Sequence, residues 1–307
     1  MKTNDCIDRY LTYIETERRL SPLTVRKYDQ ILKKFNLYLS SILIETIDEV
    51  STNDIRNWQI QLMEEGKKSR TIAAYLAALR SWFKYMKRNG YCKINITDPL
   101  TTPKLSKLIP VFFKVEEAEK IYNENIFPDS FEGERDKLIL RMLYETGMRR
   151  SELVNLTEQS IDFSARSIRV FGKRQKERII PIEIELVNNI KRYFSLKKKV
   201  ASTCSSMFID QKGNPVTSGT VYKIVNKYMK LLSVSEKTSP HVFRHTFATG
   251  MLNEGANINA IKELLGHGSL NATEIYTHVT REHLKEAYSH SHPRAKKQKT
   301  KQAKQAK

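Results

Sequence analysis

The chain has 307 residues, of which 40% are hydrophobic and 28% charged, a composition typical of a soluble globular protein with room for two domains. Fifty-three lysines and arginines against 34 acidic residues give a formal charge of +19, which favours a polyanionic partner such as nucleic acid. A basic amphipathic membrane binder is disfavoured because the charge is dispersed along the chain. The first residues lack the apolar stretch of a signal peptide, so we expect a cytoplasmic protein without membrane contact.

Residues 1–92 predict a compact helical domain, because apolar residues recur at three- and four-residue spacing. Ser21-Pro22 indicates the start of a second helix, with a capping serine and a proline in the first helical position. Ser51, with an aspartate three residues later, resembles a capping box and predicts the start of a third helix. The fourth helix is expected over residues 69–89.

Residues 93–110 contain three prolines and no helical period, which predicts an interdomain linker or a plain surface loop. The second domain, 111–290, mixes helical periods with two short β-branched runs, SIRVFGK and ERIIPI, that predict a hairpin. Its helices are expected over residues 115–126, 133–145, 183–199, 218–232, 241–254, 257–265, 270–277 and 281–289, with another beginning near Arg150. Residues 291–307 form a basic tail. The predicted fold class is therefore mainly α with a small β-hairpin or sheet in the second domain (α+β).

Six polar residues stand out in the second domain because they lie in five short, recognisable sequence motifs. They are Arg149, Lys173, His241, Arg244, His267 and Tyr276. Together they predict a cationic cage around one phenolic nucleophile, which suits attack on a phosphodiester without a metal, because charge grows on the phosphate oxygens during the reaction. Arginine fits this task best, since its planar fork donates two parallel hydrogen bonds and keeps its charge.

Spacing suggests where the cations lie. Gly147 breaks one helix just before another starts, so Arg149, with Arg150 as its competitor, is expected near a helix N-terminus that favours anions. His241 and Arg244 are three residues apart on one predicted helix and face the same way. His241 and His245 have the spacing of a helical zinc pair. However, no glutamate follows the first histidine and no third ligand is evident, so we predict no metal site.

Tyr276 needs activation, because a phenol with its ordinary pKa near 10 is mostly neutral at pH 7. His241 is the candidate base and His267 the candidate donor to the phosphate, although the two histidines could exchange these roles. Lys173, on the hairpin turn, could protonate the leaving oxygen. Arg174 and Lys176 share that turn and compete for the assignment.

Five sequence motifs, in this order, resemble those of the tyrosine recombinases of the phage-integrase family: TGMRRSEL, FGKRQKER, SPHVFRHTFAT, LLGHGSL and EIYTHV. The resemblance extends over nearly the whole chain. The resemblance maps the family's catalytic pattern onto the six residues above, and Glu152 onto an acidic position that supports the site. Within the family the chain most resembles the Xer branch, and its HPRAKK ending is similar to that of the XerC group.

The resemblance implies a C-shaped, two-domain clamp on double-stranded DNA. Four protomers would assemble on two sites as a homo- or hetero-tetramer, with a paralogous recombinase as the expected partner. Tyr276 would form a 3′-phosphotyrosyl link and strand exchange would proceed through a Holliday junction, with no cofactor, ATP or magnesium. The implied role is resolution of chromosome dimers at cell division. Integration, excision or inversion of a mobile element uses the same chemistry and stays open as an alternative.

Two other interpretations stay open. A relaxing topoisomerase is less favoured, because the helical first domain suits reading of a DNA site. A DNA-binding protein without any reaction would rely on charge and helices alone. Candidates for DNA contact in the first domain are Arg26, Lys27, Arg70 and Arg80, on the second and fourth helices, and these side chains could touch phosphates only.

Overall fold

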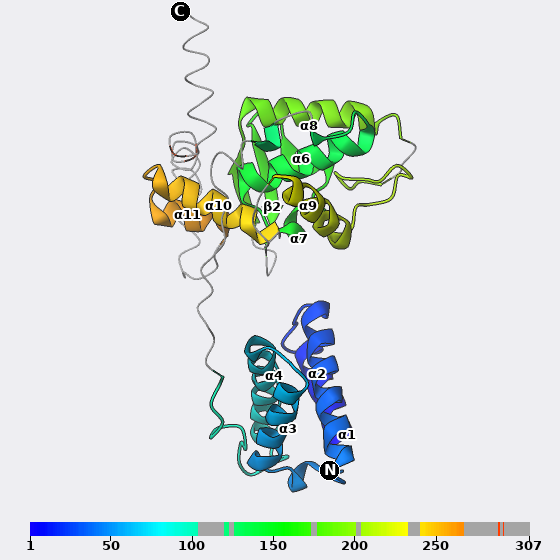
Figure 1. The fold of residues 1–307 in the computed structure, drawn as a ribbon, viewed down its shortest axis with the longest axis vertical. Coiled ribbons are helices and arrows are strands. Elements are labelled where there is room, and N and C mark those ends of the chain that lie inside the picture. Colours follow the sequence, from blue (N-terminus) through cyan, green and yellow to red (C-terminus); the bar gives the residue numbers. More distant parts are fainter. Residues whose placement is uncertain are drawn as a thin grey trace, which may run out of the picture. The chain divides into compact units, whose positions relative to one another are not determined.

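The computed structural model describes residues 1–103, 120–122, 126–172, 177–200, 204–232, 240–266, 288 and 291. The chain forms two compact units, Met1–Leu108 and Ile109–Lys307, which are drawn together in Figure 1. The predicted fold class, mainly helical with a small antiparallel sheet, is confirmed. Within the described ranges, no helix combines the length and the apolar character that a membrane span requires.

The first unit contains four α-helices and one short 3-10 helix in its described part. They are α1 (Thr3–Thr16), α2 (Pro22–Ser41), η1 (Ile47–Glu49), α3 (Thr52–Glu64) and α4 (Ser69–Arg88). The predicted helix starts are confirmed, because the Ser21 side chain accepts a hydrogen bond from the Thr24 backbone N–H and Ser51 forms a reciprocal capping box with Asp54.

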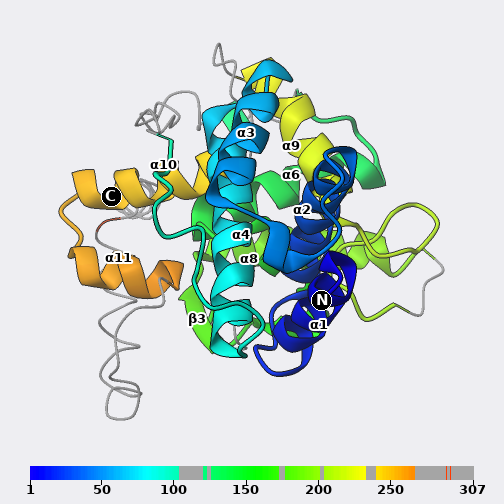
Figure 2. The same cartoon turned by 90° about the horizontal axis from the view of Figure 1, so that it is seen from below.

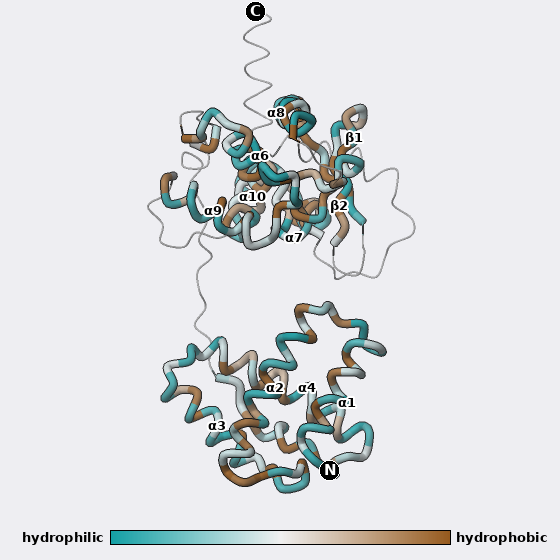
Figure 3. Tube along the Cα trace, turned by 90° about the vertical axis from the view of Figure 1, so that its right-hand side faces the viewer, coloured by the Kyte–Doolittle hydropathy of each residue, from teal (hydrophilic) through white to brown (hydrophobic). Residues whose placement is uncertain are grey.

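Both tryptophans of the chain lie in the core of this first unit. Trp58 and Trp82 are buried around Phe35, with ring centroids 4.9 and 6.3 Å from the phenylalanine ring. Hydrophobic and hydrophilic stretches alternate along the helices (Figure 3), so each helix turns one apolar side to this core. Tryptophan fluorescence therefore reports on the first unit alone.

The segment predicted to be a linker begins inside the first unit. Leu100 is only 5% exposed and packs in the core, and Thr97 is buried. Arg80 donates hydrogen bonds to the Leu100 carbonyl and, at 2.7 Å, to Thr102 Oγ1. This candidate DNA contact therefore ties the middle of the segment to helix α4.

We expect Arg80→Met to destabilise the first unit by about 1 kcal/mol or more, because a charged donor to two partners is lost. Urea unfolding followed by tryptophan fluorescence measures this directly. Arg70→Met is the matched control, since Arg70 is an exposed residue of the same helix and should change stability by less than about 0.5 kcal/mol. Equal midpoints for the two variants would contradict a structural role for Arg80.

The second unit surrounds helix α6. Its described elements are η2 (Lys120–Tyr122), α6 (Phe131–Thr146), α7 (Arg150–Val154), η4 (Glu158–Ser160), β1 (Ile161–Asp162), β2 (Ser167–Phe171), β3 (Glu177–Pro181), α8 (Ile184–Lys197), α9 (Ser218–Leu232), α10 (Pro240–Asn253) and α11 (Ile258–Leu265). The helix predicted over 115–126 is described only at η2. The helix predicted over 270–277 lies outside the described residues, and that predicted over 281–289 is described only at residue 288, which is helical.

The sheet is antiparallel with strand order β1-β2-β3. Strands β2 and β3 form the predicted hairpin, with Phe171 opposite Glu177 and Val170 opposite Arg178. Strand β1 was not predicted, because two residues are too few to show an alternating pattern.

Helix α6 is buried on nearly all sides and contacts both α8 and α10. Its buried charges are paired: Arg141 donates to Glu145 at 3.1 Å and to Glu185 at 2.9 Å. Helices α10 and α11 lie side by side (Figure 2). They share a small apolar cluster that includes Phe247 and Leu265. This packing brings the C-terminal end of α11 to the junction between α6 and α7.

Candidate active site

The junction between α6 and α7 is a sharp turn at Gly147. This residue adopts a left-handed conformation with φ of 60°, and its N–H donates to the Leu143 carbonyl at 3.1 Å. A Cβ here would lie 2.7 Å from a ring carbon of Phe247 and 2.9 Å from a Leu265 methyl group. Only glycine fits both the conformation and the space, and the turn makes Arg149 the N-cap of α7.

Glu152 holds Arg149 at two points. One carboxylate oxygen accepts the Arg149 backbone N–H at 2.7 Å, and the other accepts its Nη1 at 2.7 Å. The Glu152 side chain is only 4% exposed, whereas that of Arg149 is 34% exposed. A buried carboxylate thus orients a guanidinium that reaches solvent at the start of a helix.

Arg178, from strand β3, completes the pairing of Glu152. Its Nη1 and Nη2 donate to the two carboxylate oxygens at 3.0 and 2.7 Å. Burial by itself raises the pKa of Glu152, but the hydrogen bonds from Arg178 and Arg149 outweigh it and hold this pKa below its usual value. Glu152 is therefore a carboxylate at neutral pH.

Arg244 enters the site from helix α10 and is 8% exposed. Its Nη1 donates to the Gly147 carbonyl at 2.9 Å, and its Nη2 donates to the Leu265 carbonyl. Burial, with the Arg149 charge nearby, lowers the pKa of Arg244 to about 10. The guanidinium therefore stays protonated at pH 7, and two backbone carbonyls set the plane of its fork.

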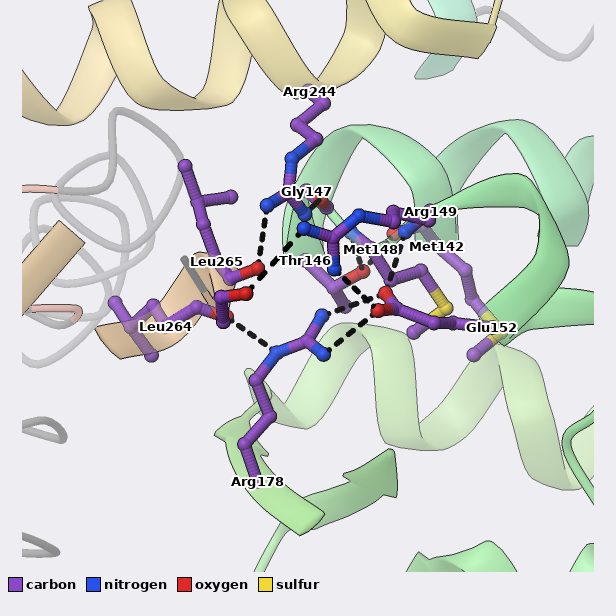
Figure 4. Close-up of polar contacts among 11 residues, drawn as sticks. Met142, Thr146, Gly147, Met148, Arg149, Glu152, Arg178, Arg244, Leu264 and Leu265 are labelled. Carbon is purple, nitrogen blue, oxygen red and sulfur yellow. Dashed lines mark hydrogen bonds and ion pairs between the residues drawn. The ribbon is translucent and has the colours of Figure 1, made fainter. Parts of the chain in front are cut away.

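The end of helix α11 receives all three arginines. Arg178 Nε donates to the Leu264 carbonyl at 2.7 Å, Arg244 donates to that of Leu265, and Arg149 Nη2 lies 3.4 Å from that of Gly266. Three successive carbonyls at the negative end of a helix thus each meet a different guanidinium, as Figure 4 shows for the labelled residues. This helix end aligns the arginines with one another.

His241 lies in the first turn of α10, three residues before Arg244, and is exposed. Partial burial of the imidazole ring lowers the pKa of His241 below its usual value. The nearby positive charge of Arg150 lowers it further. The imidazole is therefore neutral at pH 7 and able to accept a proton.

The three arginines and Glu152 together carry a net charge of +2. Guanidinium forks converging on one place are suited to an anion with several oxygens, such as a phosphate diester. In the described part of the chain, no three His, Cys, Asp or Glu side chains are grouped in a way that could hold a metal ion.

Sequence comparison assigns this arrangement to a family. Residues 112–283, more than half of the chain, match the phage integrase family, and residues 7–90 match the N-terminal SAM-like domain of phage integrases. The chain belongs to the phage integrase family. It is a site-specific tyrosine recombinase, an enzyme that cleaves and rejoins DNA.

Curated relatives of this tyrosine recombinase cover it almost completely. Tyrosine recombinase XerC of Oceanobacillus iheyensis is 39% identical over 294 residues, which is 94% of this chain and 96% of the relative. Tyrosine recombinase XerD of Staphylococcus haemolyticus is 32% identical over 297 residues, covering 94% and 99%. The predicted membership of the Xer branch is confirmed.

Solved structures share the fold of the recombinase. The Tn1549 transposon integrase in complex with transposon right end DNA is 20% identical with a TM-score of 0.71, covering 98% of this chain and 99% of the other. The XerH site-specific recombinase bound to a palindromic difH substrate is 22% identical with a TM-score of 0.70, covering 92% and 83%. At such identities these structures show the common fold only.

The structure brings together four of the residues predicted for the recombinase site. They are Arg149, Glu152, His241 and Arg244. Lys173, His267 and Tyr276 lie outside the described residues. The neighbours of two of them are described: Phe171 ends strand β2 shortly before Lys173, and Gly266, whose carbonyl faces Arg149, precedes His267.

Sequence reasoning missed Arg178, although its signal was present. In the hairpin Arg178 pairs with Val170 and is in phase with Ile180, and both of these side chains are buried. Strand alternation therefore places an arginine on the inward face of the sheet, where a charge requires a buried partner. That partner, Glu152, lies on another element.

The predicted DNA contacts of the first unit are on its helices. Arg26 and Lys27 are exposed on α2, and Arg70 is exposed on α4. Arg80 is half-buried and bonded to the segment after α4. Three of the four candidates are therefore accessible on the surface of the unit.

Proposed function

We propose that Tyr276 is the nucleophile of a site-specific recombination reaction in which Arg149 and Arg244 bind the scissile phosphate. The observation that carries the proposal is the alignment of both guanidiniums on the last carbonyls of α11. His267 follows those carbonyls directly in the chain, and Tyr276 comes nine residues later. The length of chain between them therefore allows both residues to reach the arginine pair.

In the proposed reaction, the Tyr276 hydroxyl attacks phosphorus and gives its proton to His241. A bond from phosphorus to the tyrosine oxygen forms while the bond to the 5′-oxygen breaks, and Lys173 protonates that oxygen. The arginines, with His267 as a further donor, stabilise the charge that grows on the non-bridging oxygens. Glu152 supports the site by holding Arg149.

The 5′-hydroxyl of a partner duplex then attacks the 3′-phosphotyrosyl link and releases the tyrosine. One exchange of strands gives a Holliday junction, and a second exchange resolves it. The phosphodiester energy is kept in the covalent intermediate throughout, so each cleavage is matched by a ligation.

The neutral His241 predicts a pH dependence. Its pKa in the folded protein is lower than that of an ordinary histidine, so the base is available at neutral pH and is lost as the pH falls through this lowered pKa. We expect single-turnover cleavage to be level around pH 7 and to decline in more acid solution, as the pH falls through the lowered pKa of His241. His241→Gln should cleave slowly without this acid limb, measured by quenched reactions on labelled DNA. An unchanged acid limb in that variant would assign the base to another group.

Resolution of chromosome dimers in the cytoplasm is the biological role that we propose. Its support is the resemblance over the whole chain to proteins named XerC and XerD. The protein would then clamp double-stranded DNA between its two domains and assemble as a tetramer with a paralogous recombinase. The exposed cations of α2 and α4 would contact DNA from the first domain.

Covalent trapping on nicked suicide substrates tests the proposal. Wild type and Tyr276→Phe are compared by denaturing gel on candidate chromosomal dimer-resolution sites and on mobile-element ends. A tyrosine-dependent adduct on the chromosomal site supports both the nucleophile and the role. An adduct confined to mobile-element ends keeps the chemistry and rejects the role. An adduct that survives in Tyr276→Phe rejects this nucleophile, and full DNA affinity without any adduct favours a binding protein.

A further inference from the structure

Arg178 connects three parts of the second unit through one side chain. Its guanidinium binds both oxygens of Glu152 on α7, and its Nε binds the Leu264 carbonyl at the end of α11, while its backbone belongs to strand β3. The side chain is 10% exposed. Because the guanidinium is planar, these bonds fix the three elements in one geometry.

Glu152 transmits this restraint to Arg149. The carboxylate that receives the fork of Arg178 also receives the backbone N–H and the guanidinium of Arg149. A rotation of the carboxylate would break bonds on both sides, so its orientation depends on Arg178 as much as on Arg149. Arg178 thus acts on a proposed phosphate ligand through an intermediate group.

The hydrogen bond to the Leu264 carbonyl lets Arg178 also fix the end of helix α11. The next two carbonyls, those of Leu265 and Gly266, face Arg244 and Arg149. Movement of the α11 end would displace both of these arginines together. Arg178 hydrogen-bonds to the first carbonyl of this series, that of Leu264, and to the Glu152 carboxylate that holds Arg149. It therefore restrains both Arg149 and the end of α11.

We infer that Arg178 is a positioning residue for DNA cleavage, which orients Arg149 through Glu152 and fixes the end of α11 beside Arg244. The inference rests on the proposed function. It concerns a residue outside the predicted catalytic set, and it assigns to strand β3 a part in aligning the phosphate site.

Arg178→Lys is the decisive variant, because lysine keeps the charge but cannot hold two carboxylate oxygens and a carbonyl at once. We expect the variant to stay folded with a lowered thermal transition and with DNA affinity close to wild type, while the single-turnover rate of adduct formation falls about 10- to 100-fold, the range for loss of supporting hydrogen bonds. Arg169→Gln is the matched control. Arg169 belongs to the same hairpin and forms an exposed ion pair with Glu177 at 3.2 Å, so its loss should leave the rate unchanged.

A substrate with an uncharged scissile group distinguishes positioning of the arginines by Arg178 from a general effect on the stability of the second unit. A methylphosphonate at the scissile position lacks one charged oxygen and depends less on the arginines, so the rate ratio of wild type to Arg178→Lys should shrink. The same ratio on both substrates, or a rate for Arg178→Lys equal to that of Arg169→Gln, would overturn the inference and leave the proposed function intact. Absence of an adduct with wild type would reject the proposed function and this role with it.

Discussion

Gly147→Ala is expected to destabilise the second unit by about 2–5 kcal/mol and to abolish most DNA cleavage. The left-handed backbone alone costs about 1–2 kcal/mol for an alanine. The new methyl group would also approach the Phe247 ring to 2.7 Å, and overpacking of this kind costs about 1–3 kcal/mol more. Cleavage suffers because the Gly147 carbonyl orients Arg244 and the turn orients Arg149.

The two units can be followed separately in this experiment. Thermal unfolding by circular dichroism should show an earlier transition, while tryptophan fluorescence, which reports on the first unit, should not change. Gly255→Ala is the matched control, because Gly255 also has a positive φ, of 84°, but a Cβ added to it would meet no other atom within 4 Å. The Gly255→Ala variant therefore measures the free-energy cost of the left-handed backbone without a steric contact. Equal destabilisation by the two substitutions would show that the contact with Phe247 is relieved at no cost.

Arg244→Ala is expected to lower the rate of covalent adduct formation by about 10²–10³-fold, the usual effect of removing one donor to a developing oxyanion. Stability should fall by about 2 kcal/mol or more, because the Gly147 and Leu265 carbonyls lose a charged donor. Arg244→Lys should recover little of the rate, since one ammonium cannot replace the planar fork.

The measurement is a single-turnover reaction on a suicide substrate at saturating protein, beside a binding isotherm at the same salt concentration. His245→Gln is the control, because His245 is the exposed residue next to Arg244 on the same helix. A rate for Arg244→Ala within a few-fold of that of His245→Gln would remove Arg244 from the phosphate site. A loss of DNA affinity equal to the loss of rate would assign it to binding.

Sequence patterns alone predicted the described α-helices of both units and the hairpin of β2 and β3. Their signals are local: Ser21-Pro22 and the box of Ser51 and Asp54 mark helix starts, and the two β-branched runs mark strands. Each signal depends on neighbours within a few residues, where side-chain period and capping chemistry act directly. The sequence motifs around Arg149 and Arg244 were recognisable for the same reason, because each is a short run of residues with a characteristic spacing.

The contacts between distant residues follow only from the way the elements pack. Arg244 contacts Gly147 across 97 positions, and Arg149 reaches Gly266 across 117. Periodicity shows which side chains share a face of one element, but it carries no information about which elements pack together. Arg80 was predicted as a candidate DNA contact, and only the structure shows that it is bonded to the segment after α4. The alternation of strand β3 would have indicated that Arg178 faces inward. Its partner, Glu152, is revealed only by the packing of β3 against α7 and α11.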